Sequence, residues 1–360
     1  VRELQPAALI NSRVGHYNQE LLGDFQEMSD KGIPPGGLDE YFQTPQTLNE
    51  TWGYSKFDTL WKSPETVIRQ LVQVVSRGGN YLLNMGPHGD GSIPDTTIAI
   101  FKEAGAWVKR HAESIYGTTA NPFGETDWGY CTVKENKLFL FMTSWKEGKE
   151  IRLHGLQNEI RSASLLGNSP MEFPVNNNGE VKSIILTAGV PADPLPVIVV
   201  EIEGVPEVDP PMVVQAENGE MAFDYMTAVT EGNTMTRFNR KGGFHISKWN
   251  SPGDAAKWWV NVTKPGKFKV MLNYSANQEW KGKPYEISIG DTHLENRVIA
   301  TNTLFDYQSF PAGYIELDQP GEYQLTIRPG VAGTSFFMYL RTIHLFPVEE
   351  PKKNGWGTGF

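Results

Sequence analysis

The chain has 360 residues, of which 39% are hydrophobic and 21% charged, an ordinary globular balance rather than that of a disordered chain. Asp and Glu (42) outnumber Lys and Arg (32), and the net charge of −10 argues against a compact basic nucleic-acid binder. The single cysteine, Cys131, excludes an intramolecular disulfide framework and a multi-cysteine zinc site. No stretch approaches about 18 consecutive apolar residues, so we expect no membrane span.

Residues 1–121 alternate strand-like and helix-like segments. The apolar run 7–10 stops at polar residues, as a buried strand does when it delivers polar side chains at its C-terminal end. Ser63 and Pro64 predict the first cap and first turn of a helix, and Gly78-Gly79 predicts its end.

A strand over 80–85 follows, and then a second helix. The residues that recur on the second helix every three or four positions are Ile98, Phe101, Ala104, Val108, Ala112 and Ile115. This order of helix, strand, loop and helix is typical of a parallel α/β unit.

The rest of the chain has no helical period. Residues 122–204 contain short strands between turn clusters and predict a small antiparallel β-sandwich. Residues 204–211 are a stiff Pro-rich linker. The pattern of residues 212–347 again predicts an all-β domain. Residues 348–360 are predicted to be a loosely held tail.

A parallel α/β unit carries its function in the loops after its strands. Three such places stand out: Arg13, Trp52, and the pair His88 and Asp90. With no second histidine near His88, we interpret that pair as turn residues rather than as a metal site or a catalytic dyad.

The first zone resembles the C-terminal half of the catalytic barrel of the glycoside hydrolase family 29 α-L-fucosidases. The resemblance runs in order over about 110 residues and includes Thr51-Trp52-Gly53-Tyr54. The other matching stretches are 9–15, 23–25, 44–45, 47–49, 61–63, 76–80, 82–87 and 112–118.

The resemblance implies a partial (β/α)8-type barrel followed by two all-β sandwich domains. The expected domains are the barrel half (1–121), a β-sandwich (122–204) and a last module (212–347) before the tail. That last module, which opens with Gln215-Ala216-Glu217-Asn218-Gly219, resembles carbohydrate-binding modules of the family 6/35 type.

The family implies retaining hydrolysis of terminal α-L-fucose, which needs a nucleophile and an acid/base carboxyl about 5–5.5 Å apart. The family's nucleophile is an Asp on a strand before the region matched here, and these 360 residues offer no equivalent. Gln43 stands where the resemblance places the acid/base Glu. Three explanations stay open: an engineered Glu→Gln change, a natural departure in which Glu27, Asp39 or Glu40 takes the role, or an inactive or misaligned site.

Three residues are candidate sugar contacts by resemblance. Arg13 aligns with an arginine near the reacting centre, although it could instead pair with a loop carboxylate. Trp52 matches an aromatic that lines the fucose pocket, with ordinary barrel packing as the alternative. His16 lies in the acid/base loop, where it is either a substrate contact or a solvent-exposed loop residue.

The last domain offers further candidates. Trp249, Trp280 and Tyr307 stand in loop-like contexts where an exposed ring could stack on a sugar, with core or turn packing as the alternative. Glu217 and Glu220 resemble ligands of a structural calcium ion in the binding-module family. We expect no cofactor for catalysis.

We therefore expect a retaining α-L-fucosidase acting on a fucosylated oligosaccharide or glycoconjugate, represented without its nucleophile-bearing half. The alternatives are a related exo-glycosidase acting on another sugar, such as a galactoside, and a non-catalytic glycan-binding protein. No nucleic-acid or membrane partner is expected. Such an enzyme is usually exported to the periplasm or the outside of the cell, and no targeting signal is visible in the sequence.

Overall fold

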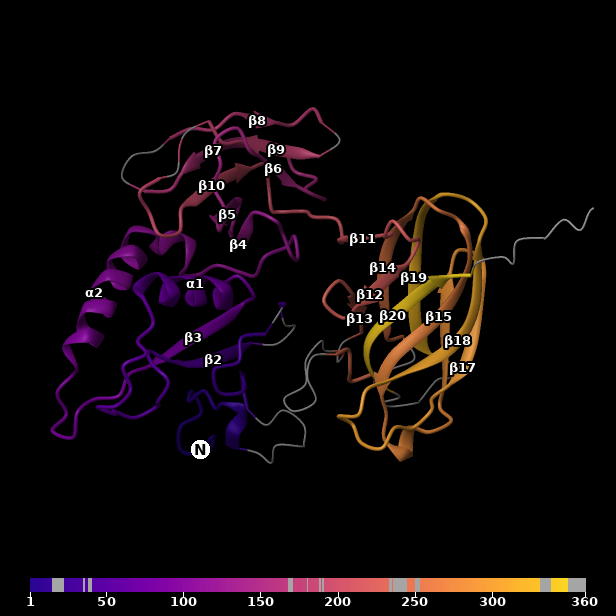
Figure 1. Ribbon diagram of the computed structural model, residues 1–360, viewed down its shortest axis with the longest axis horizontal. Coiled ribbons are helices and arrows are strands. Elements are labelled where there is room, and N and C mark those ends of the chain that lie inside the picture. Colours follow the sequence, from indigo (N-terminus) through magenta and orange to yellow (C-terminus); the bar gives the residue numbers. More distant parts are fainter. Residues whose placement is uncertain are drawn as a thin grey trace, which may run out of the picture. The chain divides into compact units, whose positions relative to one another are not determined.

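The structure, a computed structural model, describes most of the chain (Figure 1). The described residues are 1–14, 23–34, 36–37, 41–167, 171–179, 181–187, 189, 191–232, 235, 245–249, 253–330 and 338–348. The fold is mostly β and divides into two compact units, Val1–Pro211 and Met212–Phe360. The further division of the first unit at residue 121 stays a prediction.

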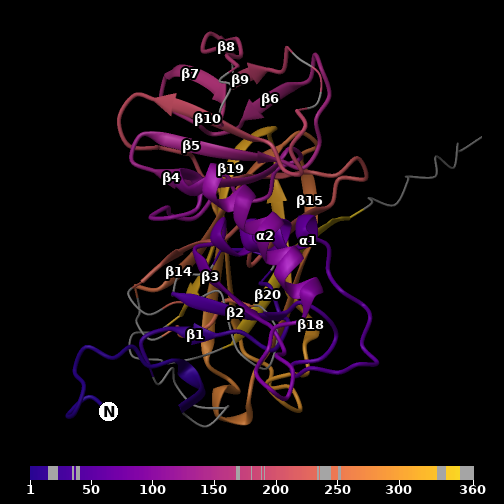
Figure 2. The ribbon, with the colours of Figure 1, turned by 90° about the vertical axis from the view of Figure 1, so that its left-hand side faces the viewer.

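The first unit contains a parallel sheet in the order β1-β2-β3, which Figure 2 shows side by side. These strands are β1 (Gln26–Glu27), β2 (Phe42–Thr47) and β3 (Gly79–Asn84). A parallel bridge from Asn11 to Phe25 adds one more position beside β1. The short helix η1 (Ser12–Val14) follows that bridge. Parallel strands bring their carboxyl ends to one edge, so the loops after them lie together.

The predicted buried strand over residues 7–10 is wrong. No ladder forms there, and Leu9 is 78% exposed. Among the described residues, this segment has a neighbour on one side only, through the single bridge of Asn11. An apolar run forms a buried strand only where a sheet flanks it and a second layer covers it.

The first helix, α1 (Pro64–Val75), begins as predicted. The hydroxyl of Ser63 accepts a hydrogen bond from the N–H of Thr66 at 3.1 Å, and Pro64 occupies the first turn. The helix buries Val67, Ile68, Val72 and Val74. The chain turns away at Gly78, whose φ of +83° is the left-handed conformation that favours glycine.

The second helix, α2 (Asp95–Arg110), buries only part of the predicted stripe: Ala104 is buried and Val108 packs against the core, as does Ile115 beyond the helix. Its buried residues are Thr97, Ile100, Ala104 and Trp107. Ile98 and Phe101 are 37% and 40% exposed and line a surface hollow together with Leu83 and Met85. Helical period alone shows which residues share a face, and neighbouring elements decide which face is covered.

Two further sheets complete the first unit, in the orders β4-β5-β10-β7 and β6-β9-β8. Their strands are β4 (Gly129–Lys134), β5 (Lys137–Met142), β6 (Glu150–Leu153), β7 (Ile160–Leu165), β8 (Val175–Asn176), β9 (Lys182–Ile185) and β10 (Val197–Ile202), with the short helix η2 (Ala112–Ser114) before them. Phe139, Phe141 and Val197 share a core cluster with residues of α1 and α2. The helical layer and the strands of β5 and β10 therefore support one another.

The second unit has two sheets, in the orders β11-β14-β19-β16-β17, with β13 beside β14, and β12-β20-β15-β18. Its elements are β11 (Met212–Val214), β12 (Met221–Asp224), β13 (Val229–Glu231), β14 (Ala255–Val262), β15 (Gly266–Ser275), η3 (Gln278–Trp280), β16 (Pro284–Ile289), β17 (Thr292–Arg297), β18 (Gln308–Leu317), β19 (Gly321–Pro329) and β20 (Tyr339–Pro347). Residues of both sheets form one core cluster, which includes Trp258, Leu325 and Ile343.

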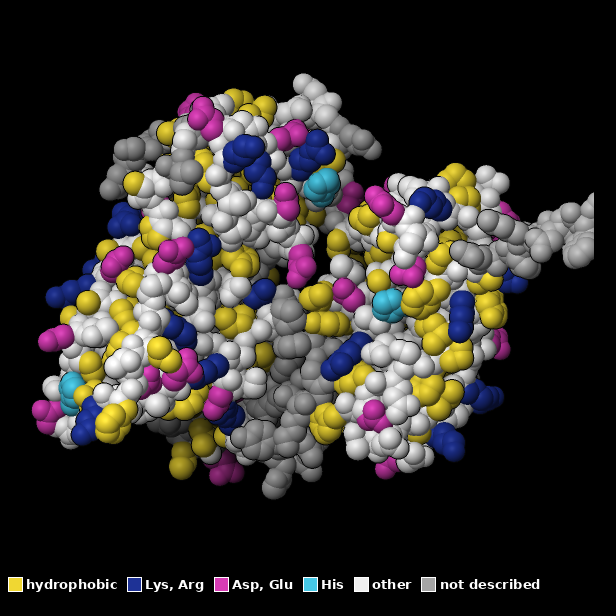
Figure 3. All heavy atoms as spheres, in the orientation of Figure 1, with side chains coloured by type: hydrophobic (Ala, Val, Ile, Leu, Met, Phe, Trp, Pro, Cys, Tyr) yellow, Lys and Arg dark blue, Asp and Glu magenta, His cyan; other side chains and the backbone are white. Residues whose placement is uncertain are grey.

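On the face of the molecule drawn in Figure 3, the Lys and Arg side chains of the described residues are interspersed with Asp and Glu. This mixture is in keeping with the net charge of −10. No helix in the described part of the chain is both long and apolar enough to cross a membrane.

Candidate active site

One face of the parallel sheet carries polar side chains. Tyr81 of β3 donates its hydroxyl to Gln70 of α1 at 3.0 Å, so Tyr81 lies on the face that α1 covers. Side chains alternate along a strand, so Asn80 lies on the opposite face, and its register partner Gln43 lies beside it there. Asn80 is exposed and Gln43 half-buried. We take this face, directed away from α1, as the floor of the candidate site.

Glu27 and Gln43 meet on this face. They are register partners in the parallel pairing of β1 with β2. The amide Nε2 of Gln43 donates a hydrogen bond to Oε2 of Glu27 at 3.0 Å. Glu27 is 7% exposed, and its backbone N–H donates to the hydroxyl of Ser12 at 2.9 Å. The sequence position that resembles the family's acid/base therefore holds an amide that touches a buried carboxyl.

Arg13 is held by the loop after β1. Its guanidinium donates to Oδ1 of Asp30 at 2.6 Å and to the carbonyl of Met28 at 3.1 Å. Both partners of the ion pair are substantially exposed, Arg13 at 39% and Asp30 at 56% of their side chains. This is the pairing with a loop carboxylate that the sequence left as the alternative. A sugar contact by Arg13 stays a prediction.

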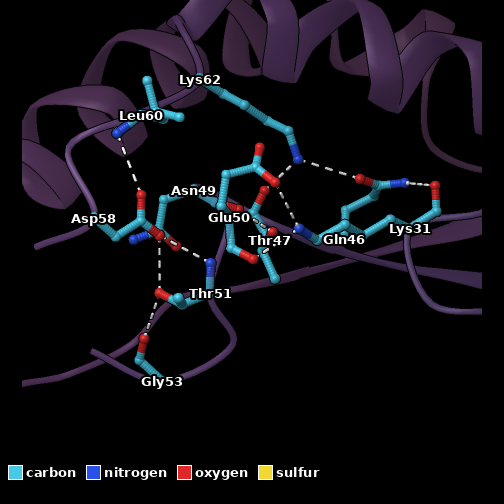
Figure 4. Close-up of polar contacts among 10 residues, drawn as sticks. All are labelled: Lys31, Gln46, Thr47, Asn49, Glu50, Thr51, Gly53, Asp58, Leu60 and Lys62. Atoms are coloured by element: carbon cyan, nitrogen blue, oxygen red, sulfur yellow. Dashed lines mark hydrogen bonds and ion pairs between the residues drawn. The ribbon is translucent and has the colours of Figure 1, made fainter. Parts of the chain in front are cut away.

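A network that the sequence did not reveal fixes the loops beyond β2 (Figure 4). The side chain of Gln46 donates to the backbone carbonyl of Lys31 at 2.7 Å and accepts from the ammonium of Lys62 at 3.2 Å. Lys62 also donates to the carbonyl of Thr47, and Lys31 pairs with Glu50 at 3.3 Å.

Burial, followed by the nearby charge of Lys31, lowers the pKa of Lys62, while Glu50 works in the other direction. The partners lie 15 to 19 residues apart in the chain. In the sequence, only Lys31, in the loop after β1, and Lys62, just before α1, could have signalled the network. Both ammonium groups are engaged by the protein, so we assign this network a structural role.

Trp52 lies in a loop held at both ends. Its carbonyl accepts a hydrogen bond from Nδ2 of Asn84, at the end of β3, at 2.6 Å. Asp58 accepts from the N–H and hydroxyl of Thr51 at 2.8 and 2.9 Å (Figure 4). Burial of Asp58 works to raise its pKa, but the hydrogen bonds from Thr51 and neighbouring backbone groups outweigh it and keep the pKa low. Trp52 is 39% exposed, and its backbone lies beside the carboxyl end of β3.

The loop after β3 behaves as a turn. Oδ1 of Asp90 accepts from the N–H and the hydroxyl of Ser92 at 2.9 and 2.7 Å. His88 packs its ring against Tyr54 with centroids 4.2 Å apart. These contacts agree with the interpretation of His88 and Asp90 as turn residues. Three other candidates, His16, Asp39 and Glu40, lie outside the described residues.

The aromatic candidates of the second unit are mostly core residues. Trp249 is fully buried and donates Nε1 to the carbonyl of Met338 at 3.0 Å, and Trp280 is 8% exposed. Neither ring is therefore an exposed sugar-stacking surface: both pack in the core cluster between the sheets, which is the alternative that the sequence left open. Tyr307 is half-buried and makes a 2.6 Å hydrogen bond with Nδ1 of His245. The guanidinium of Arg341 lies over the Tyr307 ring at 3.4 Å.

The two calcium candidates make local contacts in the described structure. Glu217 is exposed, and its backbone carbonyl accepts from the ammonium of Lys264. The N–H of Glu220 donates to Oδ1 of Asn218 at 3.0 Å in a local turn. Among the described residues, no three His, Cys, Asp or Glu side chains gather as a metal site would require. A structural calcium ion at Glu217 and Glu220 stays a prediction.

Comparison with known families gives two matches. Residues 1–113 match the family described as alpha-L-fucosidase, and residues 225–342 match a domain of unknown function (DUF5077). The N-terminal third of the chain is therefore similar to the α-L-fucosidases. The second match assigns no activity to the second unit.

Individual relatives agree with the first match. The chain is 35% identical over 118 residues to the tissue alpha-L-fucosidase of Mus musculus and 32% identical over 142 residues to the plasma alpha-L-fucosidase of Rattus norvegicus. These alignments cover 31% and 38% of this chain, but only 25% and 31% of the relatives. The chain thus spans about a quarter to a third of the length of these curated relatives.

Two solved structures are similar as well. An alpha-L-fucosidase from a Vibrio species is 25% identical with a TM-score of 0.57, covering 96% of this chain and 62% of that one. Alpha-L-fucosidase isoenzyme 1 from Paenibacillus thiaminolyticus is 33% identical with a TM-score of 0.51, covering 56% and 52%. The match to the Vibrio structure extends over both units.

Proposed function

We propose that this chain, whose residues 1–113 match the α-L-fucosidase family, takes part in the retaining hydrolysis of terminal α-L-fucose from oligosaccharides or glycoconjugates. One observation carries the proposal. The matched residues are those that build the parallel sheet and set Glu27 and Gln43 together on its face directed away from α1. The similar solved structures, themselves named alpha-L-fucosidases, support the same assignment.

The proposed chemistry follows the two-carboxyl scheme of retaining glycosidases. A carboxylate attacks the anomeric carbon while an acid protonates the leaving oxygen. Water then releases the sugar, with the second group acting as base. Because carboxyl groups supply both functions, we propose that catalysis needs no cofactor.

The surroundings of the sheet suit a sugar with both hydroxyls and a methyl group. Asn80 offers an amide on the floor of the site, and Leu82, two residues further along β3, is 46% exposed on the same face. Trp52 adds a partly exposed aromatic residue whose backbone lies beside the carboxyl end of β3. We propose that these apolar groups face the C6 methyl of fucose and that Arg13 contacts a sugar oxygen.

The finer architecture is also part of the proposal. We propose that the parallel sheet belongs to a (β/α)8-type barrel, and that the two sheet pairs that follow are β-sandwiches. The second unit then serves as a carbohydrate-binding module of the 6/35 type, with Tyr307 as its remaining aromatic candidate. Export to the periplasm or outside the cell suits an enzyme of this kind.

The test is release of nitrophenol from an aryl α-L-fucoside, compared with the matching aryl galactosides, by the protein as its gene encodes it. Preferred release from the fucoside, with a product that keeps its anomeric configuration by NMR, supports the proposal. Preferred release from a galactoside favours the related exo-glycosidase. Fucose binding without any hydrolysis favours a glycan-binding protein.

A matched pair of variants tests the pocket. Trp52→Ala removes the ring proposed to face the sugar, and we expect the KM for the fucoside to rise several-fold. Phe57→Ala truncates an aromatic that is 84% exposed, and we expect KM to stay the same. Equal effects of both changes would contradict the role given to Trp52.

A further inference from the structure

We infer that Glu27, and not the residue at position 43, gives and takes the proton at this site, an assignment that rests on the proposed function. The acid/base role thereby moves from β2 to the neighbouring strand β1. The assignment starts from the contact between the Glu27 carboxyl and the Gln43 amide.

Glu27 lies within hydrogen-bond distance of the position that an acid at residue 43 would occupy. The two residues are register partners, and Oε2 of Glu27 lies 3.0 Å from Nε2 of Gln43. A Glu at position 43 would have a carboxyl oxygen close to where that nitrogen lies. The proton-bearing atom therefore shifts by only about one hydrogen-bond length, although it now comes from a different strand.

With an amide at position 43, Glu27 is the one carboxyl of this contacting pair that can give or take a proton. If position 43 were Glu, two carboxyls about 3 Å apart would compete for one proton, and the pKa of one would be pushed far from its ordinary range. Gln43 removes that competition and donates a hydrogen bond that orients the Glu27 carboxyl. The Gln at position 43 and its hydrogen bond to Glu27 are therefore both explained if Glu27 is the acid/base.

Asp30 and Glu50, two described carboxylates in the loops after β1 and β2, are ion-paired and exposed. Asp30 pairs with Arg13 at 2.6 Å and is 56% exposed, and Glu50 pairs with Lys31 at 3.3 Å. The Arg2 guanidinium and the N–H of Ile10 hold the pKa of Asp24 low, which makes it a poor proton donor. Glu27 differs from Asp30 and Glu50 in being buried on the floor of the site.

Glu27 donates a proton in the first half of the reaction and accepts one in the second. A carboxylate nucleophile forms a bond to the anomeric carbon, while the bond from that carbon to the leaving oxygen breaks and its electron pair goes to the oxygen. The proton of the Glu27 carboxyl passes to the same oxygen. In the second half, Glu27 takes a proton from water as the water oxygen attacks the anomeric carbon and the nucleophile leaves with its electron pair.

The experiment compares Glu27→Gln with the matched control Glu65→Gln, the same chemical change at an exposed position on α1. The protein as its gene encodes it is assayed with an aryl α-L-fucoside of low leaving-group pKa and with a fucosyl disaccharide. A group that protonates the leaving oxygen contributes about 10²–10⁴-fold. We expect Glu27→Gln to lose about that factor on the disaccharide and much less in the first step with the aryl fucoside.

Three readouts separate proton transfer from a structural role. In Glu27→Gln, azide should restore turnover of the aryl fucoside and give a fucosyl azide. The high-pH limb of kcat/KM, where the acid loses its proton, should disappear. Glu65→Gln should match the unchanged protein in all respects. Glu27→Asp keeps a carboxyl, and we expect it to retain the high-pH limb at reduced kcat, which provides the answer if Glu27→Gln does not fold.

Two failures are distinguishable. If the unchanged protein hydrolyses fucosides and Glu27→Gln loses the same factor on both substrates, with no azide rescue, then Glu27 is not the acid/base. The same conclusion follows if Glu27→Gln is fully active. If the unchanged protein hydrolyses neither substrate, the proposed function itself is wrong.

Discussion

Trp107 on α2 gives a direct test of how the first unit is held together. Its side chain is 1% exposed, and its ring lies 4.5 Å from that of His111 and 6.4 Å from that of Phe141 on β5. Nε1 donates to Oδ1 of Asp193, just before β10, at 2.7 Å. Trp107 therefore joins the helical layer to the strands that follow it.

Two substitutions separate the packing from the hydrogen bond. Trp107→Ala should lower the free energy of unfolding of the first unit by about 3–5 kcal/mol, because it empties a large buried volume. Trp107→Phe keeps an aromatic ring but leaves Asp193 without this donor, and a hydrogen bond to a charged group contributes about 1.5–3 kcal/mol. Trp52→Ala truncates a partly exposed ring and should cost less than about 1 kcal/mol.

The assay is urea unfolding of the whole chain, followed by far-UV circular dichroism, with the transition of the first unit fitted separately. The shared core cluster implies that the helices and the strands β5 and β10 unfold in one transition. A cost below about 1 kcal/mol for Trp107→Ala, in view of the expected range for large buried side chains, would refute the reasoning. A helical signal lost well before the β signal in the unchanged protein would also refute it.

Three further outcomes are expected. Burial lowers the pKa of His111 below its ordinary 6.5 and outweighs the opposite effect of the Asp193 charge. Below about pH 6.5 the unfolded state therefore binds more protons than the folded state, so the thermal stability of the first unit should fall as the pH drops. His111→Gln should flatten that fall. A Cβ on Gly86 would lie 2.4 Å from the backbone N of Tyr54, so Gly86→Ala should displace the loop that carries Trp52, seen as increased protease cleavage there. Trp249→Ala should destabilise the second unit by about 3–5 kcal/mol in calorimetry and leave the first unit unchanged.

Local signals placed several elements correctly. Ser63 and Pro64 mark the start of α1, and the glycines after it mark the turn into β3, because capping and left-handed backbone depend on a few neighbouring residues. The stripe predicted for α2 was confirmed only in part, since Ala104 and Ile115 are buried but Ile98 and Phe101 remain substantially exposed. Which side of a helix is covered depends on elements distant in the sequence.

The candidate site divides in the same way. The order of short motifs along residues 1–121 was enough to suggest the family and to single out Gln43, Arg13 and Trp52. The contact of Gln43 with Glu27 follows from the parallel register of β1 and β2, and the ion pair of Arg13 with Asp30 joins two loops. Neither contact has a local sequence signal, because each joins residues about 16 positions apart that only the sheet brings together.

The sequence by itself determined the chemistry available: an acidic chain with one thiol, an amide where the family resemblance places an acid, and a mostly β second half. Tertiary structure decided which groups can act together. It buried Trp249 and Trp280 in a core instead of exposing them, and it set a buried Glu27 against Gln43. Burial and strand register are set by packing between distant segments, so no local pattern contains them.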